Sequence, residues 1–247
     1  MKQTLSIIGV GAFGEFMLKH VSPYFDVAIF DAKRDLSEVT SLYNVKAGSL
    51  EEICRSDIIV LSVPVQQMGA IAEDIKPYLH RGQLVIDVAS VKCLPVKILS
   101  DALPEFADIV SLHPLFGPQS GRHGIEGLNV AVVNVRGDRT PCVIEFLKRL
   151  NLTIFETTAE DHDTQMAYVM GLTHMIAKVF KKMDLPEIFM ETKTFALLQK
   201  AVSYVIDDSD ELFYAIQRDN PFVDTTKEKF FTAVKELENH LHTAEKK

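Results

Sequence analysis

The fold is decided near the amino terminus, where residues 4–14 read Thr-Leu-Ser-Ile-Ile-Gly-Val-Gly-Ala-Phe-Gly. The apolar first half of this stretch predicts a strand, and the residues that follow it predict a helix. The motif G-x-G-x-x-G lies between them and includes Gly9, Gly11, Ala12, Phe13 and Gly14. In such a unit the first glycine permits a tight turn, the second lets the backbone approach a pyrophosphate, and the third lets helix and strand pack closely. We therefore expect a dinucleotide at the start of this helix, where free N–H groups and the positive dipole end attract phosphates.

Five more apolar runs follow within the first 150 residues, at 27–30, 58–63, 84–88, 109–112 and 130–134. They alternate with amphipathic or glycine-bounded stretches, which is typical of strand–helix–strand units around a parallel sheet. Together with the first run they give six strands, enough for a doubly wound sheet. The sequence therefore predicts an α/β fold with an N-terminal Rossmann-type domain, doubly wound around a mainly parallel sheet.

The composition changes near residue 151. Eleven of the twelve glycines and eight of the ten prolines come before that position. Beyond it, apolar residues recur at helical spacing from Ala167 to Phe180, and the segments 187–205, 210–218 and 225–245 predict further helices. We expect a dinucleotide-binding Rossmann domain at residues 1–152 and a smaller, all-helical substrate and dimerisation domain at residues 153–247.

The charge balance limits the partners of the chain. It has 34 acidic and 26 basic side chains, a formal net charge of −8. This argues against nucleic acid or an anionic membrane as the main partner, because both reward a basic face. No apolar run approaches the roughly 18 residues that a membrane-spanning helix needs. We therefore expect neither a nucleic-acid partner nor a membrane partner.

The cysteines and the amino terminus bear on location. Cys54, Cys93 and Cys142 are widely spaced, which is typical of free thiols in a reducing compartment. The first apolar run ends in glycines rather than in the cleavage site of a signal peptide. No set of His, Cys, Asp and Glu residues has the spacing of metal ligands. The sequence predicts a cytoplasmic protein without a metal site.

Asp31 bears on the choice of dinucleotide. It ends the second apolar run, 22 residues after Gly9, close to the distance at which an acidic side chain accepts the adenosine ribose hydroxyls. Its carboxylate would repel a 2′-phosphate, so NAD is favoured over NADP. Lys33 and Arg34 weaken this preference, because a neighbouring cation can accommodate the additional phosphate.

Three polar segments follow predicted strands at the edge where open α/β sheets bind ligands. The first contains Ser62, Val63 and Pro64, and its proline ends the strand, so we expect the nicotinamide nearby. The second, at residues 87–92, reads Asp-Val-Ala-Ser-Val-Lys and contains Ser90. The third, at residues 111–121, reads Ser-Leu-His-Pro-Leu-Phe-Gly-Pro-Gln-Ser-Gly.

These segments carry a resemblance to a known family. The order G-x-G-x-x-G, S-V-K and H-P-x-x-G-x-x-S-G resembles the prephenate/arogenate dehydrogenases of tyrosine biosynthesis. Residues 160–163, Glu-Asp-His-Asp, and 171–174, Gly-Leu-Thr-His, resemble the E-x-H-D and L-x-H motifs of the family's dimerisation domain. The resemblance covers residues 4 to 180 in good register. It implies an oxidoreductase that converts prephenate to 4-hydroxyphenylpyruvate by NAD-dependent oxidative decarboxylation.

The resemblance also implies roles for single residues. His113 would be the catalytic base that accepts the proton of the ring hydroxyl, a role suited to an imidazole. Ser90 would share that hydroxyl or orient His113, and would lie beside the cofactor. The other residues expected to contact substrate in this way are His174, Gln119, Ser120 and Gly121. His162 belongs to an acidic first helical turn, for which a solvated capping cluster is the simpler interpretation.

One position departs from the family pattern. The family usually has an arginine in the segment after its L-x-H helix, where it binds the ring carboxylate bidentately. The corresponding residues, 191–202, contain no arginine and offer Lys193 and Lys200 instead. Lysine supplies the charge but lacks the planar fork of a guanidinium. Arg218 and Arg122 remain alternatives.

Gln119 bears on the choice of substrate. Arogenate carries an ammonium group where prephenate carries a keto group, so an acidic residue in this loop would favour arogenate. The neutral Gln119 gives that ammonium no partner, which favours prephenate. Another carboxylate that reaches the substrate would reverse this preference.

Three alternatives to a prephenate dehydrogenase remain open: an arogenate dehydrogenase, another dehydrogenase of the β-hydroxyacid type with Lys178 or Lys181 as its catalytic lysine, and a non-catalytic dinucleotide sensor. For the prephenate dehydrogenase we expect a homodimer formed through the helical half. A monomer would leave the apolar residues between 167 and 180, and the pair Phe230 and Phe231, largely uncovered. Burial of such faces between subunits is the common solution.

Overall fold

The computed structural model describes residues 2–244 and divides into two compact units after Ala159. We call them the sheet unit and the helical unit. The division comes later than residue 152, because Thr153–Glu156 forms a strand, β8, that belongs to the sheet. Residue 245, the end of the last predicted helix, lies outside the described residues.

The sheet unit is built on eight strands in the order β3-β2-β1-β4-β5-β6-β7-β8. Neighbouring strands are parallel except β6 and β7, which are antiparallel. The strands are β1 (Thr4–Ile8), β2 (Asp26–Phe30), β3 (Lys46–Ala47), β4 (Ile58–Leu61), β5 (Leu84–Asp87), β6 (Asp108–Pro114), β7 (Asn129–Arg136) and β8 (Thr153–Glu156). The six predicted strands are confirmed. The other two, β3 and β8, are short and mostly exposed edge strands that lack a continuous apolar run.

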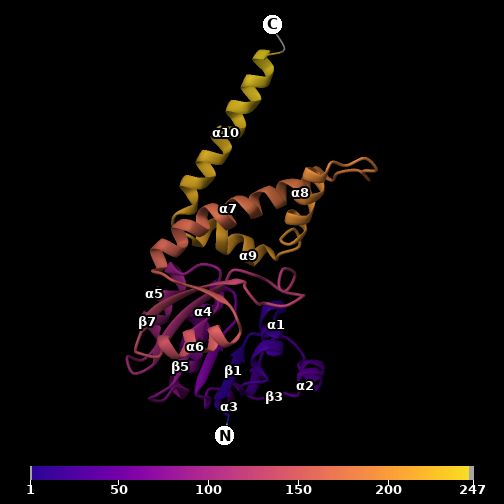
Figure 1. The fold of residues 1–247 in the computed structure, drawn as a ribbon. Helices are drawn as coiled ribbons and strands as arrows, with labels where there is room; N and C mark the ends of the chain where they lie inside the picture. Colours follow the sequence, from indigo (N-terminus) through magenta and orange to yellow (C-terminus); the bar gives the residue numbers. More distant parts are fainter. Residues whose placement is uncertain (1, 245–247) are drawn as a thin grey trace. The chain divides into compact units, whose positions relative to one another are not determined.

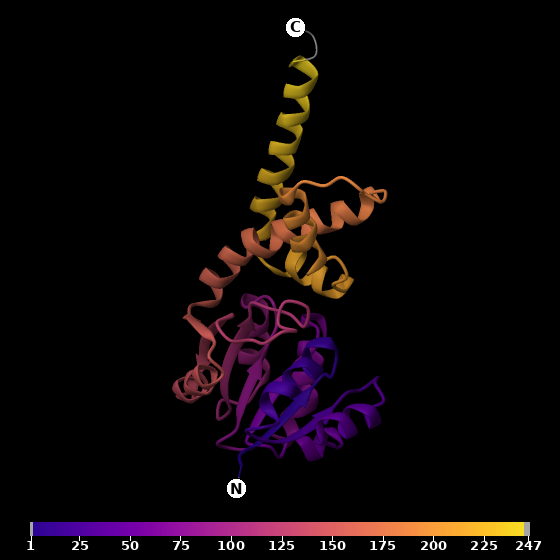
Figure 2. The same cartoon turned by 45° about the vertical axis from the view of Figure 1, so that its right-hand side comes forward.

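Helices cover both faces of the sheet (Figures 1 and 2). On one face lie α1 (Ala12–Val21), α2 (Ser37–Tyr43) and α6 (Thr140–Arg149), and on the other lie α3 (Leu50–Ile53), α4 (Val65–Ile75), η1 (Lys76–Tyr78) and α5 (Cys93–Ala102). Alternate strand residues point to opposite faces. Ile7 therefore packs with Leu18 of α1, whereas Ile8 packs with Met68 of α4. This arrangement confirms the doubly wound Rossmann-type domain.

The second unit is all-helical, as predicted. Its elements are α7 (Ala159–Met183), α8 (Lys193–Ser203), α9 (Asp210–Tyr214), the π-helical turn η2 (Ala215–Asp219) and α10 (Val223–Ala244). Helix α8 begins at Lys193, later than the predicted residue 187. The Thr192 hydroxyl accepts the N–H of Phe195 and so caps this end of the helix. The predicted helix at 210–218 is divided into α9 and the π turn.

Buried polar side chains connect the π turn to α7. Gln217 donates to the carbonyl of Gly171 at 2.8 Å, and Asn220 donates to the carbonyl of Asp163 at 2.7 Å. His162 belongs to this interior, because its ring is buried and its Nδ1 lies 2.8 Å from Asp163 Oδ1. The prediction that His162 forms a solvated cap is therefore wrong. The start of α7 is held against the π turn rather than exposed to water.

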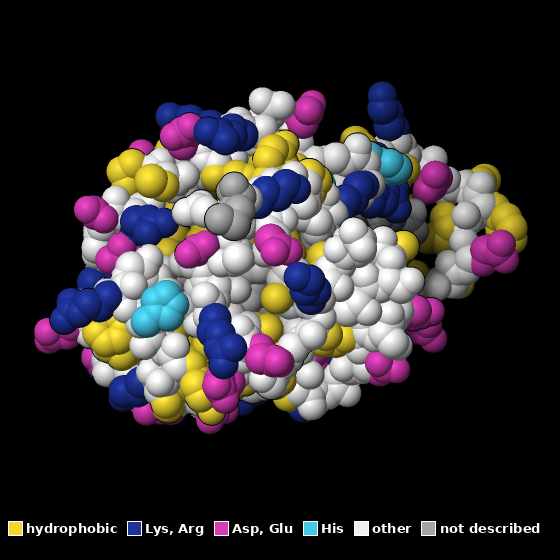
Figure 3. Space-filling view, turned by 90° about the horizontal axis from the view of Figure 1, so that it is seen from below, with side chains coloured by type: hydrophobic (Ala, Val, Ile, Leu, Met, Phe, Trp, Pro, Cys, Tyr) yellow, Lys and Arg dark blue, Asp and Glu magenta, His cyan; other side chains and the backbone are white. Residues whose placement is uncertain are grey.

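The structure bears on the cysteines, on membrane-spanning helices and on metal ligands. Cys54 is buried, Cys93 is partly buried and Cys142 is exposed, and none of the three forms a disulfide bond within the described residues. Of the helices formed by residues 2–244, none is long and apolar enough to cross a membrane. In the same range, no group of three or more His, Cys, Asp and Glu side chains is placed to hold a metal ion. On the face drawn in Figure 3, basic and acidic side chains are interspersed.

Candidate active site

The glycine turn, residues 9–14, follows β1 and packs against the segment that follows β4. Gly9 has a positive φ of 95°, which glycine adopts without strain. A Cβ atom on Gly9 would overlap the carbonyl oxygen of Ser62 and lie 2.9 Å from Val63 Cγ1, and a Cβ on Gly14 would overlap the carbonyl of Gly9. The glycine turn is therefore packed tightly against the segment at Ser62, near which the nicotinamide was predicted.

Gly11 differs from these two glycines. It is exposed, and no atom lies within 4 Å of where its Cβ would be. Gly11 is also the N-cap of α1, and no side chain caps that helix end. The first N–H groups of α1 thus face an open space that a pyrophosphate fits. These features suit the predicted dinucleotide, with the glycine turn and the start of α1 as its phosphate site.

Asp31 is engaged by the backbone around the glycine turn. Its Oδ2 accepts the N–H of Val10 at 2.8 Å, and its Oδ1 accepts those of Lys33 at 2.9 Å and Arg34 at 3.0 Å. Burial alone would raise the pKa of Asp31, but these three hydrogen bonds and the Arg34 charge together lower it below its ordinary value. An ionised carboxylate has roughly four acceptor positions, so capacity remains for a ribose hydroxyl.

Arg34 is paired with Glu15. Its guanidinium contacts Glu15 Oε2 at 2.6 Å and donates to the carbonyl of Val10 at 2.7 Å. Its charge also helps to lower the pKa of Asp31. A 2′-phosphate beside Asp31 would be repelled by the Asp31 carboxylate, and Glu15 partly neutralises the guanidinium that could bind the phosphate.

Ser90 and His113 lie at the same edge of the sheet as the glycine turn. The strands β1, β4, β5 and β6 are parallel neighbours, so their carboxyl ends share one edge. Ser90 follows β5 and is partly buried, and His113 is a buried residue near the end of β6. The structure thus brings together the predicted catalytic pair and the predicted cofactor turn.

A buried ion pair connects the turn after β5 to β6. Lys92 Nζ lies 2.6 Å from Asp87 Oδ1 and 2.6 Å from the carbonyl oxygen of Leu112, and neither charged side chain is exposed. The Leu112 carbonyl immediately precedes His113. Loss of either partner would leave a buried charge unpaired, so breaking this pair is costly. The pair therefore holds the turn after β5 against the backbone of β6 next to His113.

The loop after His113 is anchored on α1. Gly117 donates to Ser120 Oγ at 3.0 Å, and Gly121 donates to the carbonyl of Gly117 at 2.9 Å. Gly121 is buried, and a Cβ there would lie 2.7 Å from Cζ of Phe16 on α1. Gln119 and Ser120, in contrast, are exposed at the tip of this turn.

The helical unit contains the other predicted substrate residues. His174 of α7 is buried, its Nδ1 lies 2.9 Å from the carbonyl of Met170, and its Nε2 lies 3.1 Å from Asp208 Oδ2. Asp208 was not predicted. The acidic run at residues 207–211, opposite a face of α7 with basic residues at helical spacing, is the signal that could have identified it.

The candidate cations for a substrate carboxylate have different surroundings. Lys193 and Lys200 are both exposed on α8. The guanidinium of Arg218 lies over the Tyr214 ring at 3.8 Å, and Arg122 contacts its neighbour His123. The two lysines are thus the candidates that project freely from the helical segment in which the family arginine is expected.

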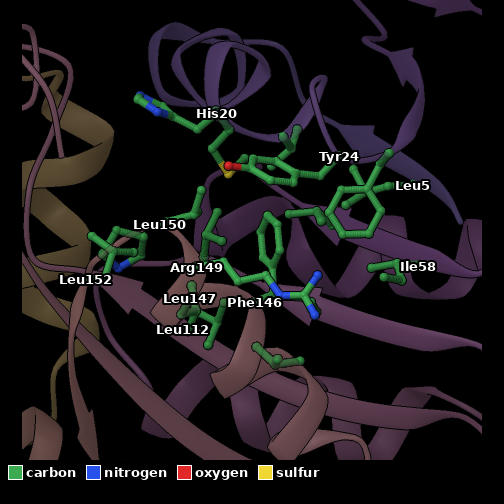
Figure 4. Close-up of a pocket in the computed structure, with 18 of the residues that line it drawn as sticks. Leu5, His20, Tyr24, Ile58, Leu112, Phe146, Leu147, Arg149, Leu150 and Leu152 are labelled. Carbon is green, nitrogen blue, oxygen red and sulfur yellow. The ribbon is translucent and has the colours of Figure 1, made fainter. Parts of the chain in front are cut away.

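A cavity of about 390 Å³ lies elsewhere in the sheet unit, between α1 and α6 (Figure 4). Its lining is mainly apolar and includes Leu5, Ile58, Leu112 and Phe146. Of the predicted site residues, Phe13 contributes to this lining, whereas Gly9, Ser90 and His113 do not. The cavity is a gap above one sheet face and is not the candidate site.

Comparison with known proteins bears on the family of the chain. Residues 28–130 match the family model described as "Prephenate dehydrogenase, nucleotide-binding domain". Arogenate dehydrogenases 1 and 2, chloroplastic, of Arabidopsis thaliana are 26% and 27% identical over 96% of this chain. The chain spans 39% of the first and 71% of the second.

The fold is shared with solved structures. The crystal structure of prephenate dehydrogenase from A. aeolicus, in complex with hydroxyphenyl propionate and NAD+, superposes with a TM-score of 0.76 at 19% identity. The alignment covers 100% of this chain and 93% of that one, so it includes both units. Residues 28–130, from within β2 to the start of β7, thus match the nucleotide-binding domain of prephenate dehydrogenases, and the chain as a whole is similar to prephenate and arogenate dehydrogenases.

Proposed function

We propose that this protein catalyses the NAD-linked oxidative decarboxylation of prephenate or arogenate in tyrosine biosynthesis. The observation that carries the proposal is the common edge of the sheet, where the glycine turn, Ser90 and His113 follow neighbouring strands. A substrate at that edge would lie beside both a dinucleotide and a histidine.

The reaction removes a hydride and CO2 from the substrate ring. As the hydride leaves the carbon that bears the hydroxyl, a base takes the hydroxyl proton and a carbonyl forms. CO2 then leaves the carbon across the ring, its bonding electrons pass through the ring to the carbonyl oxygen, and that oxygen takes the proton back, so that the ring becomes an aromatic phenol. NAD, when bound, accepts the hydride. In our proposal His113 accepts the proton, and Ser90 hydrogen-bonds the same hydroxyl or orients the imidazole. The Lys92 contact with the Leu112 carbonyl supports this role, because it holds the backbone next to His113.

The proposed cofactor site consists of the glycine turn, Asp31 and the end of β4. Its residues are Gly9, Gly11, Ala12, Phe13, Gly14, Asp31, Ser62, Val63, Pro64 and Ser90. The preference for NAD over NADP is supported by the Asp31 carboxylate and by Glu15, which pairs with the guanidinium of Arg34. A 2′-phosphate would have to compete with both of them.

The proposed substrate contacts come from the loop after His113 and from the helical unit. In the loop they are Gln119, Ser120 and Gly121. In the helical unit they are His174, with Lys193 and Lys200 as the charges for the ring carboxylate. Gln119, taken alone, favours prephenate, because it offers no charge to an ammonium group.

We also propose a homodimer formed through the helical unit. Helix α10 extends away from the other helices of this unit (Figures 1 and 2). Phe231, Val234, Leu237 and Leu241 are each at least half exposed on it and share one face. A second copy of the chain would cover this apolar face.

The proposal is tested by mixing the purified protein with NAD and either prephenate or arogenate, and by repeating each assay with NADP. NADH formation is followed by its near-ultraviolet absorbance. We expect turnover with NAD, and a His113→Asn variant that is slower by about 10²–10⁴-fold, the usual contribution of a general base. NADH affinity of this variant should equal that of the wild type.

Two other outcomes would contradict the proposal. NADH binding without turnover of either substrate would favour a dinucleotide sensor. Turnover of a β-hydroxyacid that depends on Lys178 or Lys181 would favour the other dehydrogenase type. The ion pairs of these lysines with Asp210 and Asp207 argue against a free catalytic amine.

A further inference from the structure

The cavity between α1 and α6 lies over the middle strands of the sheet (Figure 4). On the opposite face of β4 and β5, which α4 and α5 cover, Ile59, Leu61 and Val85 are each 0% exposed. On the cavity side of the same two strands, Ile58 and Ile86 remain 8% and 7% exposed. The same strands are thus fully covered on one face and less completely covered on the other.

The walls of this cavity are rich in aromatic rings. Phe16 and Tyr24 come from α1, Phe146 from α6 and Phe116 from the loop after β6. The rings of Tyr24 and Phe146 meet edge to face, with their centroids 5.5 Å apart. The volume of about 390 Å³ falls within the range of roughly 300–1,000 Å³ that is typical of small-molecule sites. Rings from three elements suit a flat aromatic molecule.

The charged groups of the lining favour an anion. Arg139 and Arg149 supply two guanidinium groups, against the one carboxylate of Glu145. Glu145 pairs with Arg149 at 2.7 Å, but both side chains are more than 60% exposed, and such exposed pairs contribute little. His20 Nε2, on the α1 wall, is buried and has no hydrogen-bond partner in the described part of the chain. An acidic group would therefore find both a cation and an unused hydrogen-bonding atom here.

We propose that this cavity is a second binding site, which takes a small aromatic acid with one or two flat rings and a carboxylate. The rings would lie between α1 and α6, and the carboxylate would meet the guanidinium of Arg149. Gly9, Ser90 and His113 do not line the cavity, so this site is separate from the proposed active site.

The cavity reaches the backbone beside the proposed base. Leu112 and Pro114, on either side of His113, line it, and so does Phe16, which packs at Gly121 of the substrate loop. A void leaves such side chains without partner atoms on one side, and a bound molecule supplies them. This step rests on the proposed function: an occupied cavity should hold the loop in place and so lower the KM of the substrate.

The test titrates the full chain calorimetrically with two probes of nearly equal shape, 1-naphthoate and its neutral analogue 1-naphthamide. The wild type should bind 1-naphthoate more tightly. In Arg149→Gln its affinity should fall by about 5–10-fold while that of 1-naphthamide is unchanged, because only the charge-assisted contact is lost. The matched control Lys148→Gln removes the neighbouring exposed cation of α6, which does not line the cavity, and should change neither affinity.

Cys142 locates the probe in the wild type. It is exposed and lines the cavity, whereas Cys93 does not line it. Saturating 1-naphthoate should slow the alkylation of Cys142 by iodoacetamide and leave that of Cys93 unchanged, as followed by mass spectrometry of the two peptides. An affinity for 1-naphthoate that does not depend on Arg149 would overturn the inference, and so would an equal rate of Cys142 alkylation with and without the probe.

The KM of the substrate distinguishes this cavity from the active site. Saturating 1-naphthoate should lower KM if it binds in the cavity, whereas competition at the active site would raise KM. A raised or unchanged KM overturns the effect on the loop. Absence of turnover without any probe would instead remove the proposed function, and the calorimetric and alkylation results would still decide whether the cavity binds an aromatic acid.

Discussion

The two units differ in how completely they cover their own apolar side chains. Among residues 2–244, four large apolar side chains are exposed in the sheet unit and seventeen in the helical unit, although the helical unit is the smaller. The four of the sheet unit are Tyr24, Leu42, Tyr78 and Phe155, which lie apart in the sequence. Single exposed side chains of this kind are normal for a monomer. The sheet unit therefore completes its core within one chain, whereas the helical unit leaves apolar side chains that the proposed dimer would cover.

This difference follows from the secondary structure of each unit. A parallel strand covered on both faces buries every side chain, as β4 and β5 do. A helix that packs on one side buries one stripe, and α10 keeps a second apolar stripe on its exposed face. Assembly should therefore respond to changes in the helical unit, and folding to changes in the sheet unit.

The largest effect is expected for Leu237→Glu on α10. Burial of a leucine is worth about 2 kcal/mol, and a carboxylate placed between subunits adds a desolvation cost. We expect the dimer to dissociate at least about 100-fold more readily, which sedimentation velocity over a dilution series would measure. The matched control Asn239→Glu adds the same charge at a polar position of α10 and should leave the dimer intact. Dimers of equal strength in both variants would mean that the apolar face of α10 is not the interface.

The next effect separates two glycines of the sheet unit. Gly14→Ala should lower the free energy of unfolding by about 1–3 kcal/mol, because the new Cβ meets the Gly9 carbonyl. Gly11→Ala meets no atom and should leave stability within about 0.5 kcal/mol of the wild type. It should nevertheless weaken NADH binding, since its methyl group occupies the space that the pyrophosphate needs. Denaturant unfolding and a fluorescence titration with NADH measure the two effects, and similar stability losses in both variants would contradict this division of roles.

A smaller effect concerns the contact between the substrate loop and α1. The Cβ of Gly121→Ala would lie 2.7 Å from Phe16 Cζ, so we expect the loop to shift and the substrate KM to rise by about tenfold, with little change in NADH affinity. Phe16→Leu should relieve the contact and restore KM in the double variant. Additive losses in the two variants would show that the contact does not set the position of the loop.

The smallest effect is the response of the Asp31 turn to acid. The pKa of Asp31 lies below its ordinary value of 3.8, so its stabilising effect is present above that value and is lost as the pH falls through the lower pKa of the folded state. Asp31→Asn should therefore be slightly less stable than the wild type near neutral pH, because the amide loses the charge-assisted hydrogen bonds of the carboxylate. The two proteins should converge as the pH falls below the pKa of Asp31 in the folded state. Denaturant unfolding at several pH values measures this, and a difference that stays constant would exclude the titration.

Much of the sheet unit could be predicted because its signals are local. Continuous apolar runs indicated six strands, and the rule that ligands bind at the carboxyl edge brought Ser90 and His113 together. The edge strands β3 and β8 were not predicted, because exposed strands need no continuous apolar run.

The helical unit was less predictable because its decisive contacts join distant residues. Asp208 meets His174 across 34 positions, and Asn220 meets Asp163 across 57. The sequence near His162 suggested a solvated helix end, yet tertiary packing buries it. No periodicity in a single helix encodes such pairings.

The backbone hydrogen bonds of Asp31 have a consequence for protein engineering. Its carboxylate holds three N–H groups of the turn, so replacing it to admit NADP would loosen the site that binds either cofactor. Glu15 differs from Asp31, because its carboxylate pairs with the guanidinium of Arg34. The simpler way to change the coenzyme preference is therefore to replace Glu15, because its removal would free the Arg34 guanidinium near the proposed ribose site.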